Sequence, residues 1–447
     1  MKNLLLKINL FFVQKKFSLL MIVFFGGVPL FLAFNIHSRA GIYNYHAEIF
    51  GDKAGYYVFL PSTFIYKFDA NAFPDSIENK IGKGFKLNHE TGKVRSKYAV
   101  GVAVLQAPFF LVAHLLAPML GYEQDGFSIP YHKSIDIAAV FYLFLGIYFL
   151  QKYLRYYFPN KLFVLISLVF FTYGTNLIYY ATQETGMSHV YSFCLFAVLL
   201  YYWKRISDSD KVKIKHIVVL SVATGFILLT RQANILLLPF VFLIDIKGVK
   251  DIQKQFFKLY KYIPLVFSIT FICFLPQIIY YFYLSGKPYV DLYEDESFIY
   301  KFSPKIIQIW FSLCNGFLIY NPIHLVTIAG FLWMIYNRVL NGRTLLGLFL
   351  FVTYMNASWW SWMLGCGFGH RGFVDFYPLF SIGFLYVLHE IFYNQDRRSV
   401  KIAVAILVAL LTYYNFSMGF HYPGCWYGQT DWDYKEYIRL LSSGLTF

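Results

Sequence analysis

Asp52 is the residue of this chain best suited to chemistry. It lies in 48-EIFGDKAGYYVFLPS-62, about fifteen residues after the first hydrophobic stretch, where acidic residues are rare unless they have a function. A carboxylate there is well placed to act as a general base toward a hydroxyl, and its charge favours a neighbouring positive centre. Tyr56 and Tyr57, in the aromatic segment that follows, are expected to bind the same substrate.

Two other interpretations of this acidic segment stay open. Asp52 would have only a structural role if it caps a helix or pairs with Lys53. Glu48 is the reserve candidate for the base, because it lies four residues earlier and shares a face with Asp52 if the segment is helical.

Three cations are candidates for binding a phosphate. The segment 93-KVRSKYAVG-101 brings Arg95 and Lys97 to the start of an apolar stretch, at interfacial depth. Arg231, in 229-LTRQANILLLP-239, is expected near the membrane boundary with little access to bulk water, and therefore needs an anionic partner. The structural alternatives are snorkelling side chains for the first two, and an interfacial anchor or ion pair for Arg231.

The densest polar and aromatic cluster is 358-SWWSWMLGCGFGHRGFVDFYP-378. Its four glycines allow close backbone approach, and Arg371 could bind a phosphate through two hydrogen bonds, with His370 as a further donor. Asp375 belongs to the same cluster, and Trp360 could stack on a sugar or an isoprenoid. The glycine pattern is not a nucleotide fingerprint, because no βαβ unit surrounds it.

No cofactor is predicted, but a divalent cation remains an alternative. Glu184 and His189, on the turn 181-ATQETGMSHVY-191, or the acids of 291-DLYEDE-296, could bind such an ion together with Asp52. Solvated acidic loops would look the same in the sequence. No cysteine pair has metal spacing, whereas Cys366 and Cys425 could form a disulfide if both face an oxidising compartment.

The composition places these residues in a membrane protein. Of 447 residues, 58% are hydrophobic, 22% aromatic and only 14% charged, which predicts an all-α polytopic chain. The net charge of +15 lies largely in short loops between apolar stretches, so nucleic acid is not an expected partner. Candidate spans lie at about 17–36, 134–150, 161–180, 188–203, 217–230, 234–246, 263–284, 322–336, 344–357, 376–393 and 402–418.

The basic residues decide how the chain is threaded. If 98–120 does not cross the membrane, over half of the 39 Lys and Arg fall on one side, in short loops. We therefore predict about eleven spans in one transmembrane domain, 1–447, with 98–120 as a surface or re-entrant segment. The N-terminus is expected in the cytoplasm of a cell with an inner membrane, and the C-terminus outside. The predicted outer segments are 37–133, which carries juxtamembrane helices, 285–321, 358–375 and 419–447.

Five features resemble the C-type glycosyltransferase superfamily, whose members include protein O-mannosyltransferases and aminoarabinose transferases. Two are the acid of the first outer loop, Asp52, with 55-GYYVFLP-61, and the surface helix that begins after Lys97 and contains 108-PFFLVAH-114. The others are 151-QKYLRYYF-158, 230-TRQAN-234, and the half that runs from 315-NGFLIYNP-322 to 367-GFGHRGFVDFYP-378.

This resemblance implies a membrane enzyme that takes a sugar from a polyprenyl-phosphate carrier on the extracytoplasmic face. Asp52 matches the catalytic acid of the family's first loop, and Arg371 and Lys97 would hold the lipid phosphate. The acceptor, whether glycan, lipid or protein, is not determined. The chain departs from the family in having no adjacent pair of acids and no soluble C-terminal domain. A transporter or flippase for a lipid-linked sugar is the alternative, although few charges lie in mid-span and no two related halves are apparent.

Overall fold

The computed structural model describes residues 17–293 and 296–445. The basic segment 1–16, on which the cytoplasmic N-terminus was predicted, lies outside the described residues, as do two of the acids of 291–296.

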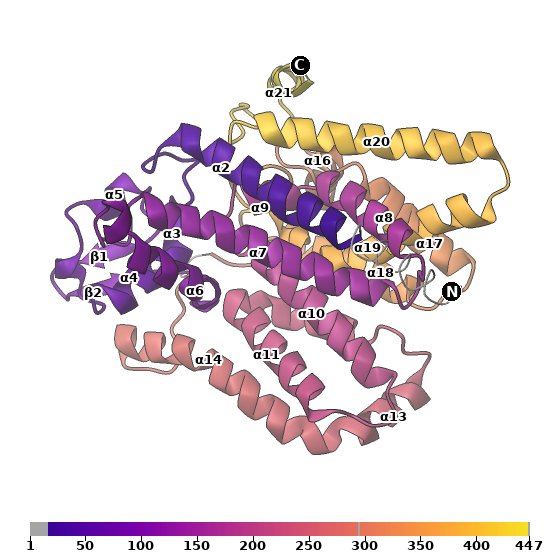
Figure 1. Ribbon diagram of the computed structural model, residues 1–447, viewed down its shortest axis with the longest axis horizontal. Coiled ribbons are helices and arrows are strands. Elements are labelled where there is room, and N and C mark those ends of the chain that lie inside the picture. Colours follow the sequence, from indigo (N-terminus) through magenta and orange to yellow (C-terminus); the bar gives the residue numbers. More distant parts are fainter. Residues whose placement is uncertain (1–16, 294–295, 446–447) are drawn as a thin grey trace, which may run out of the picture.

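The described chain is a bundle of helices (Figure 1). Its first half contains the α-helices α2 (Val28–Ala40), α3 (Asp52–Tyr57), α4 (Phe59–Phe64), α5 (Ile77–Lys80), α6 (Gly101–Leu116), α7 (Ile129–Leu154), α8 (Lys161–Tyr173), α9 (Leu177–Thr182), α10 (His189–Ser207) and α11 (Ile214–Thr230). Its second half contains α12 (Leu238–Phe242), α13 (Val249–Leu259), α14 (Ile263–Ser285), α15 (Ile306–Phe311), α16 (Phe317–Tyr320), α17 (His324–Tyr336), α18 (Gly342–Ser358), α19 (Tyr377–His389), α20 (Arg398–His421) and α21 (Tyr434–Leu445).

Shorter turns join these helices. The 3₁₀ segments are η2 (Ala70–Ala72), η3 (Pro118–Leu120), η4 (Gln232–Leu237), η5 (Tyr260–Tyr262) and η6 (Arg371–Phe376), and the π segments are η1 (Val23–Gly27) and η7 (Glu390–Asn394).

The described residues are almost entirely helical, as the all-α prediction expects, apart from one small element. A small antiparallel hairpin pairs β1 (Lys86–Asn88) with β2 (Lys93–Arg95), with Leu87 opposite Val94. Both of these central side chains are buried while their neighbours along the strands point outward, which is the alternation of a half-buried strand. The sequence scan missed this hairpin because three-residue strands carry almost no periodic signal.

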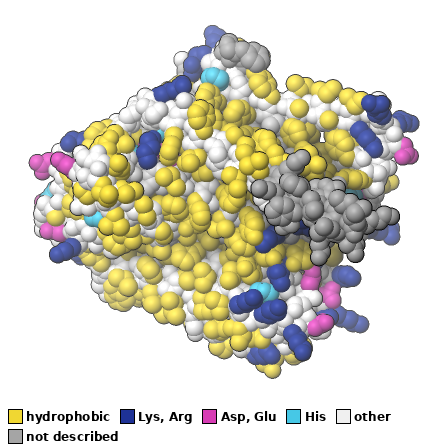
Figure 2. Space-filling model, in the orientation of Figure 1, with side chains coloured by type: hydrophobic (Ala, Val, Ile, Leu, Met, Phe, Trp, Pro, Cys, Tyr) yellow, Lys and Arg dark blue, Asp and Glu magenta, His cyan; other side chains and the backbone are white. Residues whose placement is uncertain are grey.

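Five helical segments of the described residues are long and apolar enough to cross a membrane: 17–40, 129–154, 249–285, 371–394 and 398–421. Five shorter apolar helical segments accompany them, so the predicted number of eleven spans stays a prediction. Figure 2 shows hydrophobic side chains across the middle of one face, with charged side chains gathered toward its two ends. That distribution is the one expected of a chain whose centre lies in lipid.

Burial distinguishes inner helices from outer ones. Helix α10 packs against α7 and α11, and α19 packs against α17, and both α10 and α19 are buried almost throughout. Helix α14 leaves Phe267, Phe271 and Ile279 exposed, as a lipid-facing helix does. The apolar residues that the sequence places all round α10 and α19 therefore mark the centre of the bundle.

The segment between α2 and α7 folds into a compact cap with its own apolar core. Ile49, Tyr57 and Ile81 are buried there beside Tyr280 and Tyr281, from the end of α14. Figure 1 shows α3, α4, α5 and the hairpin gathered at one end of the bundle. This cap is the element that holds Asp52.

Candidate active site

A cavity of about 350 Å³ opens between the cap and the ends of several bundle helices. Its wall is formed by the start of α3, the segment after β2, η4, residues 289–293, 296 and 298 after α14, and η6. The predicted site residues that line it are Asp52, Tyr56, Lys97, His189, Arg231 and Arg371. Six predicted site residues, from five segments that are far apart in the sequence, thus line the same cavity.

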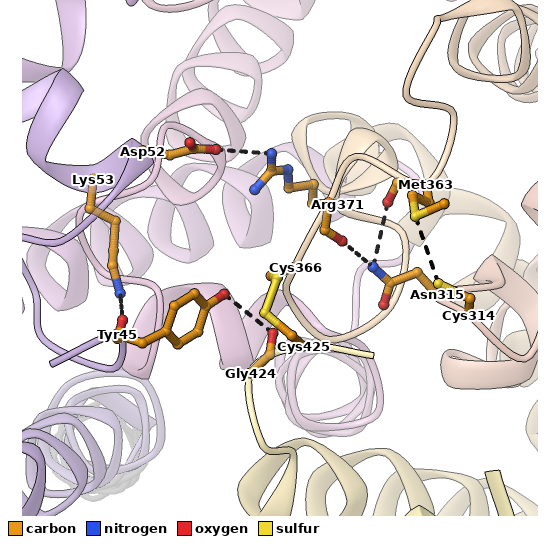
Figure 3. Close-up of a disulfide and its surroundings, with 11 residues drawn as sticks. Tyr45, Asp52, Lys53, Cys314, Asn315, Met363, Cys366, Arg371, Gly424 and Cys425 are labelled. Carbon is orange, nitrogen blue, oxygen red and sulfur yellow. Dashed lines mark hydrogen bonds and ion pairs between the residues drawn. A yellow bond between two sulfur atoms is a disulfide. The ribbon is translucent and has the colours of Figure 1, made fainter. Parts of the chain in front are cut away.

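Asp52 and Arg371 meet across this cavity, although 319 positions separate them in the sequence. Asp52 is the first residue of α3 and Arg371 the first of η6. Arg371 Nη2 donates to Asp52 Oδ2 at 3.1 Å (Figure 3). Burial raises the pKa of the Asp52 carboxyl, but Arg371, Tyr98 and Lys97 together outweigh it, so the pKa lies below its usual value. Asp52 is therefore an ionised carboxylate at neutral pH.

Three glycines position the turn that leads into α3. A Cβ at Gly84 would lie 1.8 Å from the Gly51 carbonyl oxygen, and one at Gly55 would lie 2.3 Å from the Tyr98 ring. Gly51 itself has a positive φ of 54°, which favours glycine. The cap can hold Asp52 at the cavity only because these backbones approach without side chains.

Lys97 forms the second cationic wall of the cavity. Its ammonium lies 2.6 Å from Glu296 Oε1 and within 6 Å of the Tyr98 and Tyr293 ring centres. Both partners of this ion pair are partly exposed, so the contact is exchangeable. Lys97 can thus turn toward a ligand anion without leaving a buried charge behind.

Arg231 connects the cavity wall to a buried polar network beneath it. Asp375 Oδ1 lies 2.9 Å from His189 Nδ1, and Asp375 Oδ2 accepts from Asn234 Nδ2 at 3.0 Å. Arg231 Nη1 lies 3.0 Å from His189 Nδ1 and 3.5 Å from Asp375 Oδ2. The anionic partner expected for Arg231 is therefore Asp375, one turn after Arg371 in η6.

Cys366 and Cys425 form a disulfide beside the site. Gly367 N donates to Gly424 O at 2.8 Å. Tyr45 of the cap also donates to Gly424 O, at 3.2 Å (Figure 3). The disulfide and these hydrogen bonds tie the glycine-rich loop before Arg371 to the segment after α20 and to the cap. The open question of whether these two cysteines pair is thus answered by the structure.

Six predicted residues lie away from the cavity. His370 is buried with Nε2 directed at Trp362 O at 2.7 Å, and Tyr57 donates to Gly126 O inside the cap. Glu184 pairs with Lys53 at 3.3 Å. Arg95 is exposed on β2, and Trp360 is 44% exposed while Trp359 lines the cavity in its place. Their proposed contacts with a substrate stay predictions.

Glu48 is the sixth of these residues. The helix begins at Asp52, so the shared helical face expected for the two acids does not form. The Glu48 carboxylate accepts instead from Lys133 and contacts His132, in a separate buried cluster.

Tyr98 and Asn234 are residues that sequence reasoning missed. Tyr98 shares a hydrogen bond with Asp52, and the negative charge of that carboxylate adds to burial in raising the Tyr98 pKa. Both residues lie inside segments already singled out, Tyr98 within 93–101 and Asn234 within 230–234. Their residue types alone do not indicate a function, because only the folded chain shows what they contact.

No protein-family model and no curated protein matches this chain. Among solved structures, the chain is similar to an archaeal oligosaccharyltransferase, AglB from Archaeoglobus fulgidus, in complex with an inhibitory peptide and a dolichol-phosphate. The TM-score is 0.52 at 11% sequence identity, over 92% of this chain and 56% of that one, so this chain spans little more than half its neighbour's length. The likeness that was expected from the sequence is thereby confirmed for the fold alone, which is similar to that of this oligosaccharyltransferase.

Proposed function

We propose that this chain is a membrane glycosyltransferase that moves a sugar from a polyprenyl-phosphate carrier to an acceptor on the extracytoplasmic face. The observation that carries the proposal is the convergence of the Asp52 carboxylate and the Arg371 guanidinium in one cavity. The similar fold of AglB supports it, since that protein's structure contains a dolichol-phosphate. The donor sugar, hexose or pentose, and the acceptor stay open.

The chemistry needs one base and one anion-binding group. Asp52 would accept the proton of an acceptor hydroxyl while that oxygen bonds to the anomeric carbon from the side opposite the phosphate. The bond from the anomeric carbon to the phosphate oxygen would break, and its electron pair would leave with the lipid phosphate. Inversion at the sugar is the expected result.

The cations would act on the leaving phosphate. Arg371 and Lys97 face the cavity, and each now contacts a carboxylate, Asp52 or Glu296. A phosphate that enters would replace these carboxylates as partner and release Asp52 toward the acceptor. Charge that develops on the phosphate oxygen would then meet donors already in position.

The disulfide supports an extracytoplasmic site. Disulfides persist in oxidising compartments, and the Cys366–Cys425 bond lies beside the loop that carries Arg371. The predicted threading places 358–375 and 419–447 on the same outer side, as this bond requires.

The test is a transfer assay in membranes, with radiolabelled polyprenyl-phosphate sugars as donors. We expect Asp52→Asn to lower turnover about 10²- to 10⁴-fold, as loss of a general base does, with donor binding retained. Arg439→Ala is the matched control, because it removes a similar but exposed pair, Arg439 with Glu436. Full turnover by the Asp52→Asn variant would refute the role of Asp52, and transbilayer movement of intact donor without transfer would favour a flippase instead.

A further inference from the structure

A second polar cluster lies outside the cavity, where α2, the cap and α7 meet. His37 is near the end of α2, Glu48 is in the loop before α3, and Asp136 is in the second turn of α7. All three are at least 96% buried, and one possible ligand atom from each lies within 4.8 Å of the other two. The proposed glycosyl transfer uses none of them.

The hydrogen bonds of His37 fix the direction of its lone pair. His37 Nε2 lies 3.1 Å from Gln183 O, and a carbonyl oxygen only accepts, so Nε2 carries the proton. Nδ1 then points at Asp136 Oδ1, 2.7 Å away, and at Glu48 Oε1, 3.5 Å away. A neutral imidazole would thus aim its lone pair at two carboxylate oxygens, which repel it unless a positive charge lies between them.

A lysine supplies part of that positive charge. Lys133 Nζ lies 2.8 Å from Glu48 Oε1 and 3.5 Å from Asp136 Oδ2. Among the described residues, the buried Asp136 Oδ2 accepts no hydrogen bond. Because the Lys133 side chain is 28% exposed, its ammonium can withdraw to solvent and leave its place to another cation.

We propose that His37, Glu48 and Asp136 form a binding site for a divalent metal ion, and that the Lys133 ammonium occupies the ion's place when no metal is bound. One imidazole nitrogen and two carboxylate oxygens suit Zn²⁺, whose tetrahedral ligand atoms lie roughly 3.3 Å apart given its bond lengths. The separations of Nδ1 from the two oxygens, 2.7 and 3.5 Å, lie on either side of that value. Once Lys133 turns away, two carboxylates balance the charge of one divalent ion.

The surroundings of the cluster are those of a metal site. The Gln183 carbonyl orients His37, Thr185 Oγ1 donates to Asp136 Oδ1 at 3.0 Å, and His132 contacts Glu48 at 2.9 Å. Such outer hydrogen bonds hold ligands in their binding geometry. Because Glu48 lies four residues before Asp52, a bound ion would fix the turn that leads into the candidate active site.

The experiment uses the full-length protein in detergent and Zn²⁺ alone as the probe. The protein is stripped with a chelator, loaded, washed and analysed for zinc content and zinc affinity. We expect one ion per chain in the wild type and in His89→Ala, a control that removes an exposed histidine of the cap. We expect His37→Ala and Asp136→Asn to bind zinc at least about 100-fold more weakly, since loss of outer partners alone costs about 10- to 100-fold.

Lys133→Met provides a test that removes no ligand. Its zinc affinity should rise at least about threefold, because the competing ammonium is gone, and chelation should lower its melting temperature more than that of the wild type. Unchanged or weaker zinc binding by Lys133→Met would overturn the proposal, as would a wild type that retains no ion or a His37→Ala variant that retains it fully. In these cases the positive charge between His37 Nδ1 and the two carboxylates would be a proton on His37, not a metal ion. Glycosyl transfer is not measured, so the outcome is independent of the proposed function.

Discussion

At the scale of single residues, the candidate site depends on opposite charges that shift the pKa of their neighbours. Asp52 is ionised because Arg371, Tyr98 and Lys97 offset the cost of burying it. Its depressed pKa stabilises the fold above the usual pKa of an aspartate, and that stabilisation is lost as pH falls through the lower folded-state value.

Arg371→Ala should therefore shift the pH dependence of transfer. Burial raises the Asp52 pKa, and without the guanidinium the largest opposing influence is gone. We expect the acidic limb of kcat/KM to move to higher pH, and the limb of Lys97→Ala to move less, because Lys97 lowers the pKa less than Arg371 does. Rates measured between pH 4 and 8 test this, and identical limbs in all three proteins would contradict it.

Asp375→Asn should weaken the network beneath the cavity. The substitution keeps an acceptor for Asn234 but removes the charge that faces Arg231 and His189. We expect a loss of stability of about 1–3 kcal/mol, seen as a lower melting temperature in detergent. Donor affinity should fall as well, because Arg231 loses its orientation. A variant that melts like the wild type would show that the network is not structural.

At the scale of elements, close backbone contacts position the two halves of the site. The turn into α3 touches Gly84, and the loop before η6 is tied to the segment after α20 by a disulfide. Neither constraint involves a residue that lines the cavity.

Gly84→Ala should displace α3 from the cavity. Its Cβ would overlap the Gly51 carbonyl oxygen, which is backbone and cannot rotate aside. We expect transfer to fall at least about tenfold, together with a lower melting temperature, as overpacking costs about 1–3 kcal/mol. Gly248→Ala is the control, since a Cβ there meets nothing within 4 Å. Equal activity in both variants would show that the turn tolerates displacement.

Loss of the disulfide should loosen the loop that carries Arg371. Cys425→Ser opens a covalent loop of 59 residues, which costs about 2–5 kcal/mol of stability. We expect weaker donor binding and a lower melting temperature, whereas Cys273→Ser, which removes a free cysteine, should change neither. Reducing agent should reproduce the effect in the wild type. The idea fails if Cys425→Ser binds donor as the wild type does.

At the scale of the whole molecule, the site needs the cap, η4 and η6 on one side of the bilayer. The predicted threading places them outside, together with the C-terminal segment. Figure 1 is consistent with this threading. The cap, which is predicted outside, lies at one end of the bundle, and α13, which lies between two predicted spans, is near the other end.

Cysteine labelling tests this threading. In a background that keeps Cys366 and Cys425 and lacks the other cysteines, an impermeant maleimide should label Thr430→Cys in intact cells. Ser209→Cys, in the loop between α10 and α11, should react only after permeabilisation. Thr430 is exposed and Ser209 is partly exposed in the fold, so both can react and the difference reports sidedness. The reverse pattern would place the site in the cytoplasm.

The sequence by itself determined that the chain is a helical membrane protein, and it singled out the charged residues that are expected at the membrane boundary. Long apolar helices and basic loops are local signals, so composition and spacing predicted α7, α14, α19 and α20. Asp52, Arg371 and Lys97 stood out because charges near lipid are costly.

Only the tertiary structure decided which of these residues meet. It brought Asp52 to Arg371, gave Asp375 to Arg231, and turned Glu48 away toward His37 and His132. Such contacts join segments separated by tens to hundreds of residues, and no local pattern encodes them. The glycine contacts of the cap and its short hairpin depend on the same long-range packing, which is why one-dimensional periodicity could not predict them.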